Sequence, residues 1–312
     1  MPPSAADLAA AARRLRGVAV ATPLLPAAAL TAELGRPVFV KAETLQRTGS
    51  FKFRGAFNRI AAMTDDQRGQ GVVAFSSGNH AQGVAAAARI FGCRAAIVMP
   101  SDAPIAKIAG TRGYGAEVVL YDRERESREE ISEALAAERG AVLIPSFDDP
   151  HVIAGQGTVG LEIAAAIAGQ GLVLGAVVTP LGGGGLASGI ALAMEAVAPA
   201  ARLFAAEPEH FDDAARSFAA GRILANDRKS GSSQDALLTP ELSALTFGIL
   251  RPRIAGMSAV PDGAAEEAVR YAARHLKLVV EPGGAAGLAA VLAGDIPQGE
   301  GALVIVLSGA NV

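Results

Sequence analysis

Short runs of β-branched and other apolar residues alternate with alanine-rich stretches of helix length along most of the 312-residue chain. The predicted strands are residues 37–41, 71–76, 95–99, 117–121, 142–144, 174–179, 202–206, 278–280 and 302–307. The predicted helices include residues 1–17, 81–91, 104–110, 127–139, 186–196 and 263–275. Such alternation is typical of parallel strands joined by helical crossovers. It predicts an α/β fold of open, mostly parallel sheets with helices on both faces, and the length favours two domains.

The composition argues against several classes of protein. The formal net charge is -3 and no basic stripe stands out, which disfavours nucleic acid as a partner. Gly, Pro or charge interrupts each apolar run before it reaches membrane-spanning length, and the N-terminus lacks the order of a signal peptide. The single cysteine, Cys93, allows no intrachain disulfide, and the four histidines lack zinc-type spacing. We therefore expect a cytoplasmic protein that binds neither membrane nor nucleic acid.

Three loops rich in Gly, Ser and Asn follow predicted strands, where ligands of open parallel sheets bind. Residues 76–83 open a helix, so their polar groups either cap it or bind a ligand at its positive end. Residues 182–185 are four successive glycines, which suit an anion nest around a phosphate monoester better than a merely flexible loop. No Lys-Ser/Thr follows them, which excludes a nucleoside-triphosphate P-loop. Residues 308–311 place the Ser308 hydroxyl after the last strand, as part of a site or of a simple turn.

Lys52 stands between two phenylalanines, Phe51 and Phe53. Desolvation lowers the pKa of a lysine, and a neutral lysine amine can form a Schiff base with an aldehyde. The alternative is an amphipathic side chain whose stem packs while its ammonium group reaches water. Together with a phosphate cradle and a strand-end hydroxyl, the lysine matches pyridoxal 5′-phosphate, which has an aldehyde, a phosphate and a pyridine nitrogen.

Four motifs carry a resemblance to a known family: SFKFRGA at residues 50–56, SGNHAQG at 77–83, GGGG at 182–185 and SGAN at 308–311. They resemble the fold-type II pyridoxal-phosphate enzymes, more narrowly the threonine/serine dehydratases and serine racemases. The resemblance implies a tryptophan synthase β-like fold of two twisted sheets. It also implies a large cofactor domain from residues 1–70 and 149–312, a small domain from 71–148, and a homodimer. Ala310 departs from the family, which usually has Gly there.

The resemblance assigns roles to individual residues. Lys52 resembles the Schiff-base lysine and catalytic base, and Ser77 the acid-base group on the opposite face of the cofactor. The other cofactor-binding residues would be Phe51 beside the ring, Asn79 at the ring hydroxyl, Ser308 at the pyridine nitrogen, and the phosphate cradle Gly182, Gly183, Gly184 and Gly185. The substrate-binding residues would be Ser76, Ser77, Gly78, Asn79, His80 and Arg128.

An acidic segment after the predicted strand at 202–206 suggests a metal site. Clustered carboxylates and exposed carbonyls suit Mg²⁺, Ca²⁺ or Mn²⁺, although a solvated acidic turn has the same composition. By resemblance to racemase-like members, the ligands would be Glu207, the carbonyl of Phe211, and Asp213. Glu209, His210 and Phe211 differ from the small residues usual there.

The resemblance implies a dehydratase that converts L-threonine or L-serine to a 2-oxo acid and ammonia. A serine racemase is one alternative, because Ser77 stands where racemases keep a hydroxyl. A 3-hydroxyaspartate dehydratase is another, because the segment around Arg128 resembles one that offers an arginine to a second carboxylate. A non-catalytic carrier of the cofactor would need no Ser77, and a nicotinamide-dependent oxidoreductase would need a glycine fingerprint that is missing here. The irregular residues 225–248 are expected to line the substrate pocket.

Overall fold

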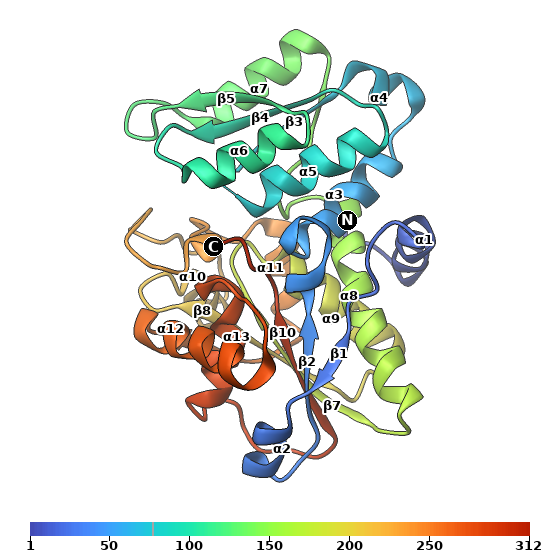
Figure 1. The fold of residues 1–312 in the computed structure, drawn as a ribbon, viewed down its shortest axis with the longest axis vertical. Helices are drawn as coiled ribbons and strands as arrows, with labels where there is room; N and C mark the ends of the chain where they lie inside the picture. The colour runs from blue at the N-terminus through green and yellow to red at the C-terminus, as the bar shows by residue number, and fades with distance from the viewer. Residues whose placement is uncertain (77) are drawn as a thin grey trace.

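The computed structural model describes residues 1–76 and 78–312, and these form two open sheets (Figure 1). The larger sheet has the order β1-β2-β10-β7-β8-β9 and the smaller has the order β5-β4-β3-β6. Adjacent strands are parallel except for β1 and β2. The predicted fold class is therefore confirmed. The strands are β1 (Leu24–Pro26), β2 (Val38–Ala42), β3 (Val72–Phe75), β4 (Ala95–Pro100), β5 (Glu117–Tyr121), β6 (Val142–Leu143), β7 (Leu174–Pro180), β8 (Arg202–Pro208), β9 (Ile254–Val260) and β10 (Ala302–Leu307).

Helices cover both faces of each sheet (Figure 1). They are α1 (Ala5–Leu15), α2 (Ala28–Leu34), α3 (Lys52–Ala61), α4 (Asp65–Gln70), α5 (Asn79–Ile90), α6 (Ile105–Gly113), α7 (Arg128–Arg139), α8 (Pro150–Gly169), α9 (Gly185–Val197), α10 (Asp213–Ala220), α11 (Ala244–Leu250), α12 (Asp262–Tyr271) and α13 (Pro282–Leu292).

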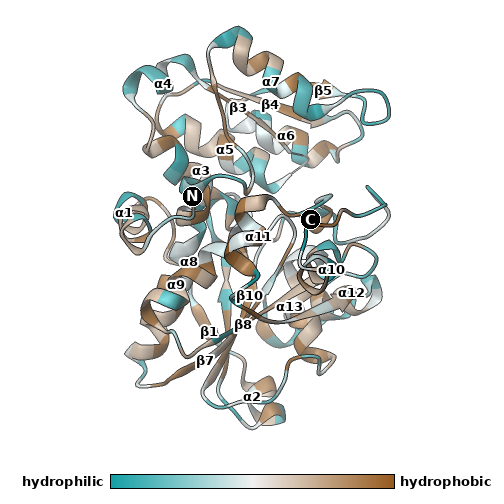
Figure 2. Ribbon diagram, turned by 180° about the vertical axis from the view of Figure 1, so that it is seen from behind, coloured by the Kyte–Doolittle hydropathy of each residue, from teal (hydrophilic) through white to brown (hydrophobic). Residues whose placement is uncertain are grey.

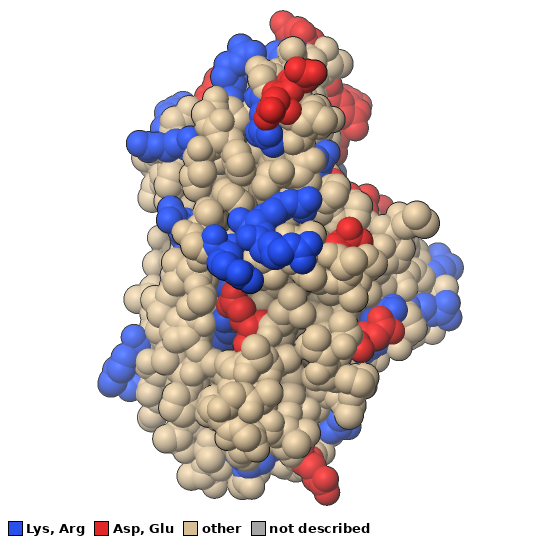
Figure 3. All heavy atoms as spheres, turned by 90° about the vertical axis from the view of Figure 1, so that its right-hand side faces the viewer, with Lys and Arg blue, Asp and Glu red and all other residues tan. Residues whose placement is uncertain are grey.

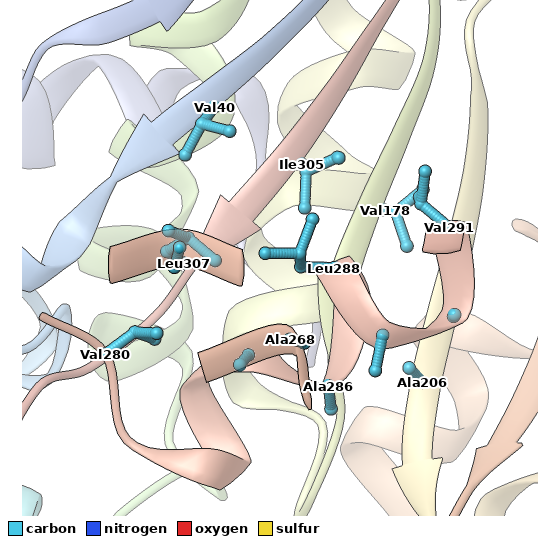
Figure 4. Close-up of a cluster of buried hydrophobic side chains, with 14 of the residues drawn as sticks. Val40, Val178, Ala206, Ala268, Val280, Ala286, Leu288, Val291, Ile305 and Leu307 are labelled. Atoms are coloured by element: carbon cyan, nitrogen blue, oxygen red, sulfur yellow. The ribbon is translucent and has the colours of Figure 1, made fainter. Parts of the chain in front are cut away.

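The larger sheet is buried on both faces because its central strands are apolar at nearly every position. Val178 and Ile305 belong to the core beneath α12 and α13, whereas their neighbours Val177 and Val304 belong to the core beneath α8 and α9. Successive strand side chains point to opposite faces, so each strand contributes to both cores. Figure 4 shows the first of these cores, with Leu288 of α13 beside Ile305. In Figure 2 the strands and inner helices carry most of the brown, hydrophobic residues, and the exposed helix α4 is teal.

Helix α8 is the one described helix that is long and apolar enough to cross a membrane by length and composition. However, 61% of that stretch is buried inside the structure, where α8 packs against α1, α3 and α9. A mostly buried helix of this kind is typical of a protein core.

On the face drawn in Figure 3, charged side chains are scattered apart from a cluster of basic ones. Figure 3 shows basic side chains gathered on one face at the level where the two sheets meet. On that face α1 and the residue after it carry the exposed arginines Arg13, Arg14 and Arg16.

The structure differs from the sequence-based prediction in four segments. Residues 278–280 form no strand, and they link a π-helical turn, Ala272–Leu276, to α13. The sequence pattern missed the short edge strand β1 and also missed β9, whose IAGMSAV sequence contains few β-branched residues. Residues 225–248, predicted to be irregular, contain a 3₁₀ turn at Asp235–Leu237 and the start of α11.

The predicted domain bounds remain a prediction, and packing connects α3 with both units. Phe53 and Ile60 of α3 share a hydrophobic core with Val72 of β3 and Ile97 of β4. The same helix packs against α8 of the larger unit, so packing alone assigns α3 to neither unit.

Candidate active site

A cavity of about 320 Å³ lies between the two sheets, and the three predicted loops meet in it. The expected cofactor and substrate residues that line it are Phe51, Lys52, Ser76, Gly78, Asn79, His80, Arg128, Gly182, Gly183, Gly184, Gly185 and Ser308. Ser77 lies outside the described residues. The rule that ligands bind at the carboxyl ends of parallel strands accounts for the convergence, because these loops follow β3, β7 and β10.

Lys52 is the first residue of α3, and its side chain lies along the cavity wall. Its Nζ donates to the carbonyl of Ser146 at 3.0 Å and lies 5.3 Å from the centre of the Phe51 ring. Burial lowers the pKa of this amine from 10.5 to about 8. Roughly a tenth of Lys52 is therefore neutral at pH 7, far more than for a lysine in water. The amine is suited to act as a nucleophile or base near neutral pH.

We expect acetylation of Lys52 in cofactor-free protein to rise with pH, to be half-maximal near pH 8 and to level off at higher pH. The reason is that only the neutral amine reacts, and the neutral fraction rises as the pH passes through the pKa. Brief exposure to acetic anhydride, followed by peptide mass spectrometry, measures this against the exposed Lys229 of the same chain. A profile for Lys52 that still climbs steeply near pH 10 would contradict the lowered pKa.

Backbone hydrogen bonds tie the lysine loop to the loop after β10. The N–H of Phe51 donates to the carbonyl of Ser308 at 3.1 Å, and the N–H of Ala310 donates to the carbonyl of Gly49 at 2.8 Å. Ser50 and Gly309 form a bridge between these contacts. The pairing holds Lys52 and Ser308 at one edge of the cavity, although they are far apart in sequence.

Buried ion pairs anchor the first turn of α3. Arg54 is fully buried, and its guanidinium donates to Glu43 at 2.8 Å and to Glu162 at 2.6 Å. Lys41 also pairs with Glu162, at 2.5 Å. Removing one partner of a buried ion pair costs about 3–5 kcal/mol, so this network resists displacement of the turn that carries Lys52.

The glycine loop between β7 and α9 leaves no room for side chains at residues 183–185. Gly184 has φ +84°, in the left-handed region that favours glycine. A Cβ on Gly183 would lie 2.3 Å from the ring of Phe147, and a Cβ on Gly185 would lie 2.9 Å from Cβ of Phe147. The first N–H groups of α9 have no partners within the helix, and the helix dipole favours an anion there. The loop therefore fits a phosphate group.

Two expected ligand-binding residues begin helix α5. Asn79 Nδ2 donates to Glu281 at 2.5 Å, and Asn79 Oδ1 accepts from Asn311 at 2.5 Å. The His80 ring is buried, with Nε2 2.9 Å from the carbonyl of Ile144. Burial, then the nearby charge of Lys52, lowers the pKa of His80 to about 3, so this ring is neutral. Nε2 is directed at Ile144, and the other ring nitrogen, Nδ1, is buried without a hydrogen-bond partner among the described residues.

Several residues that line the cavity were not foreseen from the sequence. Ser146 and Phe147 follow β6, and the polar sequence after that predicted strand was a signal for them. The remaining charged residues come from distant segments, and they are Lys107, Arg123, Lys229 and Asp235.

The charged rim of the cavity is mostly basic. Arg128 stacks on Phe75, with 5.0 Å from its guanidinium carbon to the ring centre, and pairs with Glu129 at 2.8 Å. Lys107 pairs with Asp235 at 2.7 Å. Arg123 also pairs with Asp102 at 2.8 Å, so acidic partners offset much of the positive charge of Lys107, Arg123 and Arg128, and with Lys229 the rim keeps only a small excess of positive charge to attract anions.

The acidic segment, which begins inside β8 because that strand extends to Pro208, lies apart from the cavity lining. Glu207 is buried and accepts from the N–H groups of Ala214 and Ala215, at 3.1 and 3.0 Å, so it caps α10. Asp213 Oδ1 accepts from Asn226 at 2.7 Å, and its Oδ2 is buried without a hydrogen-bond partner among the described residues.

Both carboxyl groups are hard to ionise. Burial, then the charge of Asp213, raises the pKa of Glu207 well above its usual value, and burial raises that of Asp213 to about 7. The described residues hold no group of three or more His, Cys, Asp or Glu side chains suited to a metal. Two buried carboxylates with one unpartnered oxygen nevertheless fit a hard cation whose other ligands are carbonyls.

Comparison with known proteins gives consistent matches over nearly the whole chain. The family described as pyridoxal-phosphate dependent enzyme matches residues 15–309. An L-threo-3-hydroxyaspartate ammonia-lyase from Pseudomonas sp is 47% identical over 285 residues, which are 91% of this chain and 88% of that protein. A serine racemase from Schizosaccharomyces pombe is 38% identical over 99% of this chain and 94% of its own. The crystal structure of a threonine deaminase from T.th. superposes with a TM-score of 0.92 at 47% identity, covering 99% of both chains.

Proposed function

Because the chain belongs to the family of pyridoxal-phosphate dependent enzymes, we propose that it is an ammonia-lyase for β-hydroxy amino acids that prefers a 3-hydroxyaspartate. Its cofactor is pyridoxal 5′-phosphate, and it is a lyase of the threonine and serine ammonia-lyase type. The preference for the dicarboxylic substrate is the proposed part. The resemblance implied L-threonine or L-serine first, and relatives named for threonine are also among the matches.

The observation that carries this preference is the basic rim of the cavity. Arg123, in the loop after β5, and Arg128, at the start of α7, line the cavity, and Lys229 lines it from the segment before α11. Serine and threonine present no second charge to these groups, whereas 3-hydroxyaspartate presents a second carboxylate. A guanidinium is well suited to bind a carboxylate through two parallel hydrogen bonds. The name of the Pseudomonas relative supports the same substrate.

The residues around the cavity suit the individual steps. When bound, the cofactor supplies a ring that withdraws electrons from the substrate Cα. Lys52, with its lowered pKa, would take the α-proton. The glycine loop would hold the phosphate, and the N–H groups at the start of α5 would hold the α-carboxylate.

Two further polar groups would act on the cofactor ring. Asn79 would donate to the ring oxygen, and Ser308 would pair with the pyridine nitrogen. A hydroxyl does not keep a proton on that nitrogen as a carboxylate would. Early loss of the β-hydroxyl is therefore favoured over a long-lived carbanion. Ser77 remains the proposed acid-base group for the opposite face, and a serine racemase activity depends on it.

The test is a substrate panel for wild type and for Arg128→Met. We expect wild type to release oxo acid from L-threo-3-hydroxyaspartate with the highest kcat/KM. Arg128→Met should lower that value by about 10²-fold, since loss of a charge-assisted contact costs up to about 3 kcal/mol. Activity on L-serine should change little, which makes L-serine the internal control. If serine or threonine is preferred by wild type, or if Arg128→Met lowers all activities equally, the proposed preference is wrong.

We also propose that Glu207, Asp213 and the carbonyl of Phe211 hold Mg²⁺, Ca²⁺ or Mn²⁺ and thereby stabilise the fold. The pKa values of Glu207 and Asp213 are higher in the folded protein than in the unfolded chain. Protonation of these carboxyls at low pH therefore stabilises the fold. That contribution is lost as the pH rises towards about 7, the folded pKa of Asp213. A bound cation would offset the loss, because a ligand that binds only the folded state stabilises it.

We expect Mg²⁺ to raise the melting temperature of chelator-treated protein at pH 8 by about 2 °C or more, and to have little effect at pH 5. Asp213→Asn should be insensitive to Mg²⁺ at both values, because it lacks one carboxylate. Differential scanning fluorimetry measures both. If wild type has the same melting temperature with chelator and with Mg²⁺ at pH 8, the proposed cation site is ruled out.

We also propose a homodimer, which rests on the family resemblance, and a cytoplasmic location, which rests on the composition of the chain. Light scattering of the purified protein tests the first, and cell fractionation tests the second.

A further inference from the structure

Glu281 is a buried carboxylate behind the cavity, and the steps proposed above do not use it. Its side chain is 2% exposed, and it occupies the N-cap position of α13 without making any capping hydrogen bond. Instead its Oε1 accepts from Asn79 Nδ2 at 2.5 Å, across 202 residues of sequence. Its Oε2 is buried with no hydrogen-bond partner among the described residues. This buried carboxylate does not cap its own helix and instead binds a residue of the cavity. We therefore expect it to act on that residue.

The backbone is shaped to admit this contact. A Cβ on Gly309 would lie 2.1 Å from Glu281 Oε1 and 3.0 Å from Asn79 Nδ2. Gly309 is also the residue that bridges to Ser50, so its backbone is held in place on that side. The space occupied by the Glu281–Asn79 pair is therefore kept open by a glycine in the loop that carries Ser308.

A chain of hydrogen bonds fixes which way the Asn79 amide points. Asn311 Nδ2 donates to the carbonyl of Thr48 at 2.8 Å, so this atom is the amide nitrogen. The same nitrogen donates to Asn79 at 2.5 Å, which makes that atom Oδ1. Asn79 Nδ2 must then face Glu281. One of its two N–H groups is bound by Glu281, and the second is left for a ligand.

The charge of Glu281 supports this arrangement near and above neutral pH. Burial raises its pKa to about 7, while the Asn79 hydrogen bond and Lys107 act to lower it and Asp235 acts to raise it. Once ionised, a carboxylate can only accept hydrogen bonds. It would then repel Asn79 Oδ1 and hold Nδ2.

We propose that Glu281 is a positioning residue that holds the Asn79 carboxamide with its second N–H directed at the ring oxygen of bound pyridoxal phosphate. Asn311 secures the amide from the other side. This inference rests on the role proposed for Asn79 but not on the choice of substrate.

The experiment measures binding of two probes by isothermal titration calorimetry to protein freed of its cofactor. The first probe is 4-deoxypyridoxine 5′-phosphate, which keeps the ring hydroxyl and lacks the aldehyde. The second is the same compound without the ring hydroxyl. Glu281→Met should bind the first probe about tenfold more weakly than wild type, as expected for one weakened hydrogen bond. It should bind the second probe as wild type does.

Two matched variants separate positioning from packing. Glu281→Gln keeps an acceptor at the same distance but loses the charge, so its affinity for the first probe should lie between those of wild type and Glu281→Met, and it should bind the second probe as wild type does. Glu281→Asp keeps the charge, but its shorter side chain moves the carboxylate away from Asn79. It should therefore lose affinity for the hydroxyl-bearing probe alone. This variant replaces Glu281→Met in the test if Glu281→Met does not fold. Equal weakening of both probes, or unchanged affinity for the first probe in Glu281→Met and Glu281→Asp, would overturn the proposal. Neither probe reacts with Lys52, so such a failure would leave the proposed substrate untouched.

Discussion

Replacing Lys52 with alanine is expected to abolish covalent attachment of pyridoxal phosphate and to lower turnover by at least about 10³-fold. A positioned general base alone contributes about 10²–10⁴-fold, and the variant loses the attacking amine as well. Wild-type protein should be yellow, and borohydride should remove the band and leave a cofactor mass on the peptide that contains Lys52. Lys107→Ala is the matched control, because Lys107 lines the same cavity but pairs with Asp235. It should keep the adduct.

A reducible adduct that persists in Lys52→Ala would show that another lysine attaches the cofactor. Intact-mass and peptide mass spectrometry identify that lysine directly.

Replacing Gly183 with alanine is expected to weaken cofactor binding by about tenfold to hundredfold. The new Cβ would lie 2.3 Å from the Phe147 ring, and the loop must shift to admit it. Overpacking of this kind costs about 1–3 kcal/mol, and the displaced amides would no longer surround the phosphate. Equilibrium dialysis with pyridoxal phosphate measures the loss.

A second substitution tests the cause. The Cβ of Gly183→Ala would meet ring atoms of Phe147, whereas that of Gly185→Ala would meet its Cα and Cβ. Phe147→Ala should therefore restore much of the affinity of Gly183→Ala and none of that of Gly185→Ala. If Phe147→Ala rescues both variants or neither, steric conflict with the ring is not the cause of the loss.

The fold was predictable wherever local pattern and tertiary environment agree. The β10 sequence is apolar throughout and lies at the centre of the larger sheet, so its bounds were predicted correctly. Residues 278–280 have a similar local preference, but Val279 is 64% exposed and none of the described strands pairs with them. β9 has the opposite character, because pairing with β8 imposes an extended conformation on a sequence containing Gly256. In both segments tertiary contacts override propensity.

The parts of the site that sequence predicted are those carried by single loops. Lys52, Asn79 and the glycine loop each lie next to a recognisable strand or helix boundary. Ser146, which holds the lysine amine, contributes only a backbone carbonyl, and no residue type signals that. Glu281 reaches Asn79 only because β10 and α13 bring distant segments together. The direction of the His80 ring could not be predicted from the sequence either, because the contact with the carbonyl of Ile144 determines it.

Three of the four basic rim residues are encoded in one stretch of the gene that contains none of the proposed cofactor-binding residues. Lys107 follows β4, and Arg123 and Arg128 follow β5, whereas the glycine loop and Ser308 follow strands of the larger sheet. Selection for a new substrate charge would therefore find its targets among codons 107–128 and leave the cofactor loops intact. A directed-evolution library confined to those codons should yield altered substrate ranges while most of its members still bind the cofactor.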